Sequence, residues 1–325
     1  MEQVSPSLDH VPSTQVARVT EHAAVAAAML SGRGDERAAD QAAIAAMRAE
    51  LSLTSISGTV VVGEGERDQA PALYVGEAVG AGGVEVDIAL DPLEGTTICA
   101  KNLPNALTLI ALAEPGCLLK VPDVYMEKIA VGPGYPDGIV SLDRSPADNL
   151  GALADARKVP VQQITACILD RPRNAGLIEE IRSVGAAIRL IGDGDVAGVI
   201  HTTDRAVTGI DIYMGIGGAP EGVLAAAALR CMGGQMQGRL QLNTLDKRAR
   251  AEKMGLGHPD RIFTLADMVA GDVVFAATGV TDGNLLDGVR MHAGSIATHS
   301  LILRSRSRTV RNVRTRHHDL SRFGL

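Results

Sequence analysis

The hexapeptide Asp91-Pro92-Leu93-Glu94-Gly95-Thr96 has the residue types that could most directly do chemistry. It presents two carboxylates and a hydroxyl beside a glycine, which lets the backbone turn tightly. A hard cation such as Mg²⁺ is typically held by one or two carboxylates together with phosphate oxygens of a substrate. Acidic residues beside proline and glycine are also ordinary turn chemistry. The hexapeptide alone therefore leaves a metal site and a plain turn open.

Other acidic side chains occur where strands are expected to end or helices to begin. Glu64, Glu66 and Asp68 follow the β-branched run 59–62 on a glycine-bearing turn. Glu221 follows a glycine-rich stretch and stands at the start of an expected helix. Carboxylates placed repeatedly at such ends are candidates for the same metal site.

Asp40 has two interpretations. A helix is expected over 38–51, and Asp40 lies four residues before Ile44, at the head of the apolar stripe of that helix. The residue is either an N-terminal cap that faces solvent or a ligand directed at a site.

Cationic and glycine-rich segments complement these acids. Arg171 and Arg173 follow a strand expected over 164–169, and the glycine-rich loop 215–218 precedes a helix. Guanidinium groups pair bidentately with phosphate, and backbone amides at a helix N-terminus can cradle it. Phosphate binders and clustered oxygen ligands in one chain predict metal-assisted phosphoryl chemistry.

Two alternative functions, a kinase or NTPase and a dinucleotide-binding protein, are disfavoured because their motifs are absent. A kinase or NTPase should carry a glycine-rich loop that ends in Gly-Lys-Ser/Thr, and the chain has none. The stretch from Gly215 to Gly218 does not complete Gly-x-Gly-x-x-Gly, and Glu221 would place negative charge near a pyrophosphate. Hydrolysis of a phosphate ester is therefore the simpler prediction.

Hydrophobic periodicity predicts the elements that must position these residues. The alternating run 84–90 predicts a half-buried strand that Pro92 ends, because proline cannot donate to a strand ladder. The remaining expected elements of the first half are helices over 16–30 and 38–51 and strands over 59–62, 106–113 and 123–128. Those of the second half are helices over 148–159 and 177–184, strands over 164–169, 187–191 and 209–214, and a helix after residue 222. Alternation of strands and helices in that half indicates parallel pairing, with sites where strands end and helices begin.

Composition indicates a globular α/β enzyme. The chain has 325 residues, 46% of them hydrophobic, and 36 glycines, but only 2% aromatics and no tryptophan. The net charge of −7 disfavours nucleic-acid binding in general. No apolar run reaches the roughly 18–20 residues of a membrane span, and the N-terminus lacks the pattern of a signal peptide. The four cysteines are widely spaced and predict reduced thiols, so a cytoplasmic protein is expected.

The segment 304–316 carries six arginines, three of them at strand spacing. A basic run this short predicts a solvated sheet edge or a subunit contact, with RNA binding as the alternative.

Several long motifs in order resemble one family. The hexapeptide resembles the Asp-Pro-x-Asp/Glu-Gly-Thr motif of the lithium-sensitive, metal-dependent sugar and inositol phosphatases, and the narrower resemblance is to class II fructose-1,6-bisphosphatases. It spans about 16–314 and is carried by segments 32–35, 62–66, 91–96, 122–128, 131–134, 193–197, 215–222 and 307–311. The family usually has Lys-Pro-Arg where this chain has Arg171-Pro172-Arg173, and Lys where it has Glu36.

The resemblance implies a layered α/β/α/β/α sugar-phosphatase fold with two lobes. We expect an N-terminal metal-binding lobe over 12–163 and a C-terminal lobe over 164–325. The resemblance also implies a homodimer or homotetramer that requires Mg²⁺ or Mn²⁺. The implied metal ligands are Asp40, Glu64, Asp91, Glu94 and Glu221. The implied substrate contacts are Glu94, Gly95, Thr96, Tyr125, Arg171, Pro172, Arg173, Asp193, Gly194, Asp195 and Gly218.

The implied reaction is metal-assisted hydrolysis of the 1-phosphate of fructose 1,6-bisphosphate. Metal ions would neutralise the phosphoryl oxygens and acidify the attacking water. Thr96 would hydrogen-bond the phosphoryl group or orient that water, and Glu66 or Asp68 would accept its proton. Arg171 and Arg173 would hold the distal phosphate. The alternatives are sedoheptulose 1,7-bisphosphatase activity, an inositol-phosphate-type phosphatase, and a non-catalytic metal-binding or RNA-binding protein.

Overall fold

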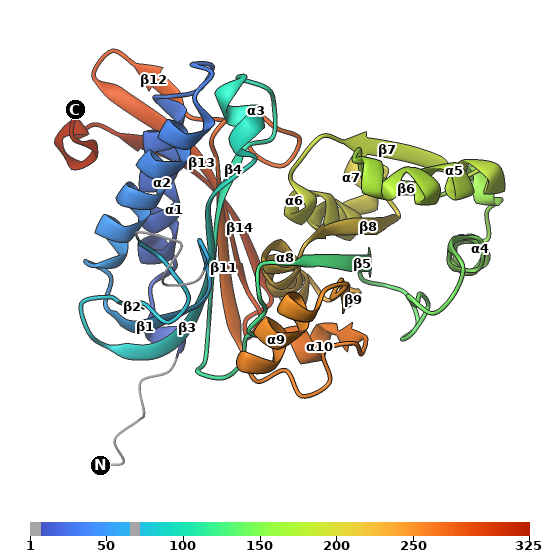
Figure 1. Ribbon diagram of the computed structural model, residues 1–325. Helices are drawn as coiled ribbons and strands as arrows, with labels where there is room; N and C mark the ends of the chain where they lie inside the picture. The colour runs from blue at the N-terminus through green and yellow to red at the C-terminus, as the bar shows by residue number, and fades with distance from the viewer. Residues whose placement is uncertain (1–7, 66–71) are drawn as a thin grey trace. The chain divides into compact units, whose positions relative to one another are not determined.

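The computed structural model describes residues 8–65 and 72–325 and divides the chain into two compact units. The first unit comprises residues up to Leu118 together with Gly271–Leu325, and the second comprises Leu119–Ala270 (Figure 1). The division expected at 163/164 therefore differs from that of the structure. Residue 163 lies inside the second unit because β5 (Tyr125–Val131) pairs with strands that come after it.

The first unit is one mixed sheet with helices packed on it. Its strands run in the order β12-β13-β11-β4-β3-β1-β2, and β14 pairs with β13 at the edge. The strands are β1 (Ile56–Val62), β2 (Ala78–Val79), β3 (Val84–Glu94), β4 (Leu107–Ala113), β11 (Val273–Gly279), β12 (Arg290–His292), β13 (Ser295–Arg304) and β14 (Thr309–His317). The helices are α1 (Ser13–Ala28), α2 (Glu36–Leu51) and α3 (Thr96–Ala100), with short 3-10 turns η1 (Leu8–His10) and η5 (Leu320–Phe323).

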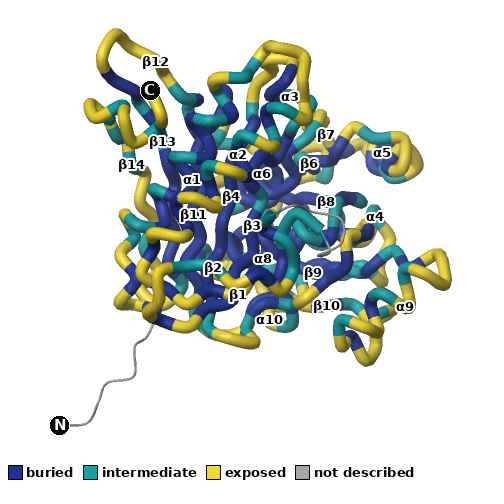
Figure 2. Tube along the Cα trace, turned by 60° about the vertical axis from the view of Figure 1, so that its left-hand side comes forward, coloured by how far each residue is buried: buried dark blue, intermediate teal, exposed yellow. Residues whose placement is uncertain are grey.

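Helices α1 and α2 pack against each other and against one face of this sheet (Figure 1). Both helices are alanine-rich, which allows close approach, and their buried residues form one cluster with side chains of β1, β3 and β4. Strands β4 and β11 are buried along their whole length, as the dark tube in Figure 2 shows. The first sheet is therefore held by apolar packing at its centre.

Strand β3 runs longer than the sequence predicts. It continues through Pro92 to Glu94, whereas the alternating pattern predicts an end at residue 90. Asp91 pairs with Leu109 and Glu94 with Leu107, so one extra residue forms a bulge. Pro92 falls inside that bulge, where no ladder hydrogen bond requires its missing N–H.

The second unit is a six-stranded sheet in the order β10-β9-β5-β8-β6-β7. Besides β5 its strands are β6 (Thr165–Leu169), β7 (Ala187–Ile191), β8 (Ile212–Gly218), β9 (Gln235–Leu240) and β10 (Phe263–Thr264). Its α-helices are α4 (Pro146–Arg157), α5 (Ala175–Val184), α6 (Asp195–Ile200), α7 (Arg205–Thr208), α8 (Ala219–Met232), α9 (Leu245–Lys253) and α10 (Leu265–Met268). The 3-10 turns are η2 (Val161–Gln163), η3 (Pro172–Asn174) and η4 (His201–Asp204).

The expected parallel pairing is confirmed for part of this sheet. Strand β6 pairs in parallel with β7 and β8, whereas β5 is antiparallel to β8 and β9. The predicted glycine-rich loop 215–218 is wrong: these glycines extend β8, and α8 begins directly after them. The mixed α/β composition with two lobes, each a sheet with helices packed on it, agrees with the predicted fold class. None of the described helices is long and apolar enough to cross a membrane.

Candidate active site

In the first unit, the register of β1 and β3 brings two predicted metal ligands to one sheet edge. The strands are parallel, and Val62 is paired with Ala89. Glu64 and Asp91 each lie two residues beyond that pair. Adjacent strands are about 4.8 Å apart, so Glu64, just beyond the end of β1, lies beside Asp91 within β3. Neighbouring strands therefore contribute two carboxylates, as the sequence predicts.

The hexapeptide is held by its own backbone. Asp91 Oδ1 accepts a hydrogen bond from the N–H of Leu93 at 3.0 Å, and Glu94 is buried. Gly95 adopts φ 88°, a left-handed conformation, and a Cβ there would meet the side chain of Ile98 at 2.6 Å. This turn directs the chain from β3 into α3, whose first residue is Thr96.

Asp40 is not the cap of its helix. Asp35 is the N-cap of α2, and its side chain accepts a hydrogen bond from the N–H of Ala38 at 2.9 Å. Asp40 lies one turn further along, on a helix that packs against β3 and α3. It is half-buried, and burial raises the pKa of its carboxyl. The cap interpretation is therefore wrong, and a role as a ligand remains a prediction.

The carboxylates do not form a preassembled cage in the part of the chain that the structure describes. Within residues 8–65 and 72–325, no three His, Cys, Asp or Glu side chains are grouped so that they could hold an ion. Glu66 and Asp68 lie outside the described residues. Mg²⁺ commonly keeps several waters and uses only one or two carboxylates with substrate phosphates. Paired acids at a strand end suit such a cation.

In the second unit, three parallel strands end at one edge of the sheet. Strand β6 leads into Arg171–Arg173, β7 leads into Asp193–Asp195, and β8 leads into Glu221 at the first turn of α8. The carboxyl ends of parallel strands form the usual binding edge of an open α/β sheet. The structure thus gathers all the substrate contacts predicted in this half of the chain.

The arginines at this edge are held by neighbouring groups. Arg171 forms an ion pair with Asp193 at 3.7 Å. Arg173 donates from Nε to the carbonyl of Ile216 at 2.8 Å, and its guanidinium carbon lies 4.3 Å from the centre of the Tyr125 ring. Burial raises the pKa of Asp193, while the Arg171 guanidinium opposes the shift. Two cations and a carboxylate therefore stand together where a phosphorylated sugar could bind.

Asn174 is a positioning residue that sequence reasoning missed. It is buried, and its side-chain amide donates to the carbonyls of Leu169 at 3.0 Å and Ile216 at 3.2 Å. Its Oδ1 accepts from the N–H of Ile216 at 2.8 Å. These bonds tie the arginine-bearing turn to β8. An asparagine directly after Arg171-Pro172-Arg173 is the signal that could have identified it.

Lys128 is a second residue that sequence reasoning missed. It lies on β5 with only 1% of its surface exposed and forms an ion pair with Asp195. Its Nζ also donates to the carbonyl of Gly218 at 2.8 Å. A lysine directly before the apolar residues 129–131 of a strand is the available signal, because an unpaired buried ammonium is costly.

Glu221 is electrostatically poised to receive a cation. Its Oε2 is buried and has no hydrogen-bond partner among the described residues, and the carboxylate packs against Gly218. Burial, reinforced by the Asp195 carboxylate and opposed by Lys128, raises the pKa of Glu221 to about 7. A metal ion would relieve both the desolvation and the repulsion. The residue therefore fits its predicted role as a ligand.

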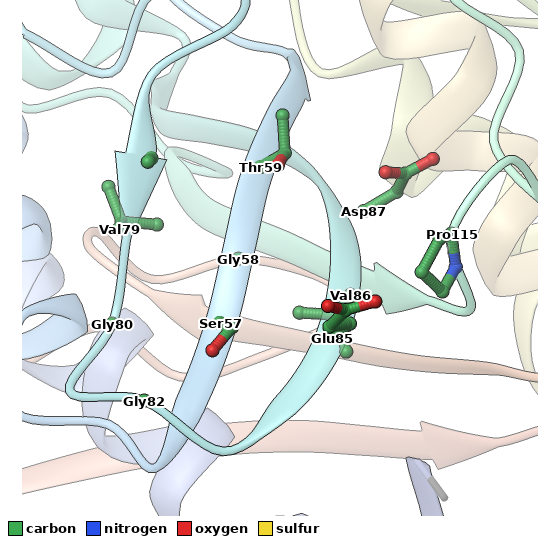
Figure 3. Close-up of a pocket in the computed structure, with 11 residues that line it drawn as sticks. Ser57, Gly58, Thr59, Val79, Gly80, Gly82, Glu85, Val86, Asp87 and Pro115 are labelled. Carbon is green, nitrogen blue, oxygen red and sulfur yellow. The ribbon is translucent and has the colours of Figure 1, made fainter.

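A pocket of about 520 Å³ on the first unit is distinct from these residues (Figure 3). It is lined by Ser57 and Thr59 of β1 and by Glu85 and Asp87 of β3, near the amino ends of both strands. The Asp87 carboxylate accepts from the N–H of Gly116 at 2.7 Å. Among the residues that the structure describes, none of the predicted site residues lines this pocket.

Comparisons with known proteins identify the family of this chain. A family model described as "Bacterial fructose-1,6-bisphosphatase, glpX-encoded" matches residues 12–317. A protein of Synechococcus sp. strain JA-3-3Ab, named D-fructose 1,6-bisphosphatase class 2/sedoheptulose 1,7-bisphosphatase, is 41% identical over 95% of this chain and 96% of its own length. A protein of the same name from Synechococcus elongatus is 41% identical over 93% of this chain and 95% of its own length. The chain therefore belongs to the class II fructose-1,6-bisphosphatases, a family of phosphoric monoester hydrolases.

Proposed function

We propose that the protein hydrolyses the 1-phosphate of fructose 1,6-bisphosphate to give fructose 6-phosphate and inorganic phosphate. The observation that carries the proposal is the edge of the second sheet, where Arg171, Arg173 and Asp193 stand together. Guanidinium groups recognise a phosphate that is retained in the product, and carboxylates accept hydrogen bonds from sugar hydroxyls.

The proposed metal ligands are all carboxylates. A divalent metal ion would supply positive charge against the phosphoryl oxygens and promote ionisation of water when bound. The residues assigned to it, partly through the family resemblance, are Asp40, Glu64, Asp91, Glu94 and Glu221. Their oxygen-only chemistry suits Mg²⁺ or Mn²⁺ rather than a metal that prefers sulfur.

The chain's own residues have separate tasks in this proposal. Arg171 and Arg173 hold the distal phosphate, and the Tyr125 ring keeps the Arg173 side chain in place. Thr96 donates a hydrogen bond to the phosphoryl group that is transferred to water. Glu66 or Asp68 accepts the proton of the attacking water.

Phosphate release tests the proposal. Purified protein should release phosphate from fructose 1,6-bisphosphate when Mg²⁺ or Mn²⁺ is present, and EDTA should abolish the release. Inositol phosphate should be a poor substrate, since it lacks the second phosphate that two arginines would bind. No release from any sugar phosphate with either metal would refute the proposal and favour a binding protein.

Sedoheptulose 1,7-bisphosphate is a second candidate substrate, because the relatives' names include that activity. It carries the same terminal phosphate and one more hydroxylated carbon. Values of kcat/KM for the two bisphosphates, measured with one preparation, decide whether the enzyme accepts both.

We also propose that the protein is a homodimer or homotetramer. The proposal rests on the family resemblance and on the basic edge strand β14, which is exposed at Arg311, Arg314 and Arg316. Sedimentation velocity at micromolar concentration would contradict it by finding only monomer.

A further inference from the structure

We propose that Lys128 is a positioning residue for the sugar: it orients the Asp195 carboxylate and the Gly218 peptide toward the hydroxyls of the substrate. The inference rests on the proposed function, since it assigns a task to a residue beside the proposed sugar site. Lys128 does not itself touch the substrate.

Lys128 is a buried cation with fixed partners. Its side chain is completely buried. Its ammonium contacts the Asp195 carboxylate and donates to the Gly218 carbonyl at 2.8 Å. One cation therefore joins the N-terminus of α6, where Asp195 lies, to the last residue of β8.

The two oxygens of Asp195 have different surroundings. Oδ2 accepts from Lys128 and lies 3.3 Å from the Tyr213 hydroxyl, which donates to it. Oδ1 is buried and has no hydrogen-bond partner among the residues that the structure describes. An unpaired buried acceptor is costly unless a ligand completes it. A sugar hydroxyl would supply the missing donor.

The backbone at Gly217 packs closely against the Lys128–Asp195 pair. A Cβ on Gly217 would lie 2.9 Å from Lys128 Nζ and would overlap Asp195 Oδ2. The backbone of β8 thus packs directly on the ion pair and leaves the carboxylate little room to rotate. Lys128 and β8 together fix the direction in which Asp195 Oδ1 can accept.

If the Lys128–Asp195 pair had only a structural role, replacing Lys128 would have a different effect. Buried ion pairs contribute little to stability and can often be replaced by apolar residues. If Lys128 only filled the core, its replacement would change stability and leave sugar binding unaltered. If it orients Asp195, sugar binding must weaken even where the protein stays folded.

The test compares Lys128→Met, which keeps the side-chain length and removes the ammonium, with a matched control. Arg157 forms an ion pair with the buried Asp211 at 2.7 Å, at the opposite end of β8, and Arg205 pairs with the same carboxylate, so Arg157→Met removes a partly buried cation away from the edge and leaves Asp211 one cationic partner. Fructose 6-phosphate binding to metal-free protein is measured by calorimetry, and KM and kcat by phosphate release. Circular dichroism establishes that each variant is folded.

We expect Lys128→Met to raise the Kd for fructose 6-phosphate and the KM about tenfold, a typical cost of one charged hydrogen bond, with a smaller change in kcat. Arg157→Met should leave all three near their wild-type values. In an Asp195→Asn background, Lys128→Met should add less than about threefold, because its effect passes through Asp195.

Unchanged Kd and KM in folded Lys128→Met would overturn the inference. The inference would also be overturned if Lys128→Met raised Kd and KM by the same factor in the Asp195→Asn background as in wild type. If Lys128→Met does not fold, Lys128→Leu, which also lacks a donor, is measured in its place under the same criteria. Wild-type protein that fails to bind fructose 6-phosphate would instead refute the proposed function.

Discussion

Replacing Arg173 with methionine should separate binding of the distal phosphate from the chemistry at the other end of the sugar. Methionine keeps an unbranched stem and removes the guanidinium that contacts the Ile216 carbonyl and the Tyr125 ring. The remaining edge, including the Arg171–Asp193 pair, should stay in place because Asn174 ties the turn to β8 independently.

The magnitude follows from the lost contact. A hydrogen bond to a charged group contributes about 1.5–3 kcal/mol, which corresponds to a roughly 10- to 150-fold rise in KM for fructose 1,6-bisphosphate. The distal phosphate is bound equally in the ground state and the transition state, so kcat should change little. Arg173→Lys should give an intermediate KM, since lysine keeps the charge but not the planar fork.

The assay uses two substrates. Phosphate release is measured from fructose 1,6-bisphosphate and from fructose 1-phosphate, which lacks the group that Arg173 is proposed to hold. Wild-type protein should favour the bisphosphate, and Arg173→Met should lose most of that preference while its kcat/KM for fructose 1-phosphate stays near wild type. An equal loss on both substrates would refute the reasoning, because it would place Arg173 at the reacting phosphate or in the fold.

Three further perturbations test other parts of the molecule. Asp91→Asn should lower kcat/KM at least about 100-fold and weaken Mn²⁺ binding in calorimetry, because a carboxylate ligand is lost; full activity would contradict the metal assignment. Gly217→Ala should raise KM and lower the melting temperature, because the added methyl meets Lys128 and Asp195; unchanged values would contradict the packing. Burial lowers the pKa of His22 to about 4, so the unfolded chain binds the proton first and the free energy of unfolding falls as pH drops below about 6.5. Between about pH 7.5 and pH 5, wild type should lose about 2 kcal/mol more of that free energy, measured by urea unfolding, than His22→Gln. Equal losses in the two proteins would contradict the lowered pKa.

Local pattern predicts the elements well because their causes are local. The run 106–113 is apolar except for Thr108 and forms β4 one residue shorter, and the alanine-rich segments form α1 and α2 within a few residues of their expected bounds. The exception is the strand predicted to end before Pro92. A bulge accommodates the proline, and a bulge depends on the partner strand β4, which local pattern does not describe.

Pairing between distant segments is the main feature that sequence reasoning missed. The return of 271–325 to the first sheet, through the pairing of β11 with β4, makes the first unit discontinuous, and the pairing of β5 with β8 and β9 moves the boundary away from residue 163. The glycines at 215, 217 and 218 are expected from the sequence to form a phosphate-cradling loop. They form the end of β8, because their missing side chains leave room for Asn174, Asp195, Lys128 and Glu221.

Metal-assisted hydrolysis of a phosphate ester can be predicted from the sequence alone. The prediction rests on carboxylates at strand ends, arginines after a strand, and the ordered motifs of a phosphatase family. Those features are carried by residue type and spacing, which are local. Only the tertiary structure shows that Glu64, just beyond β1, lies beside Asp91 of β3 and that the Arg171 and Asp193 turns share an edge. It also decided that a buried Lys128 holds Asp195. Each of these depends on the register between strands far apart in the chain, which no local pattern encodes.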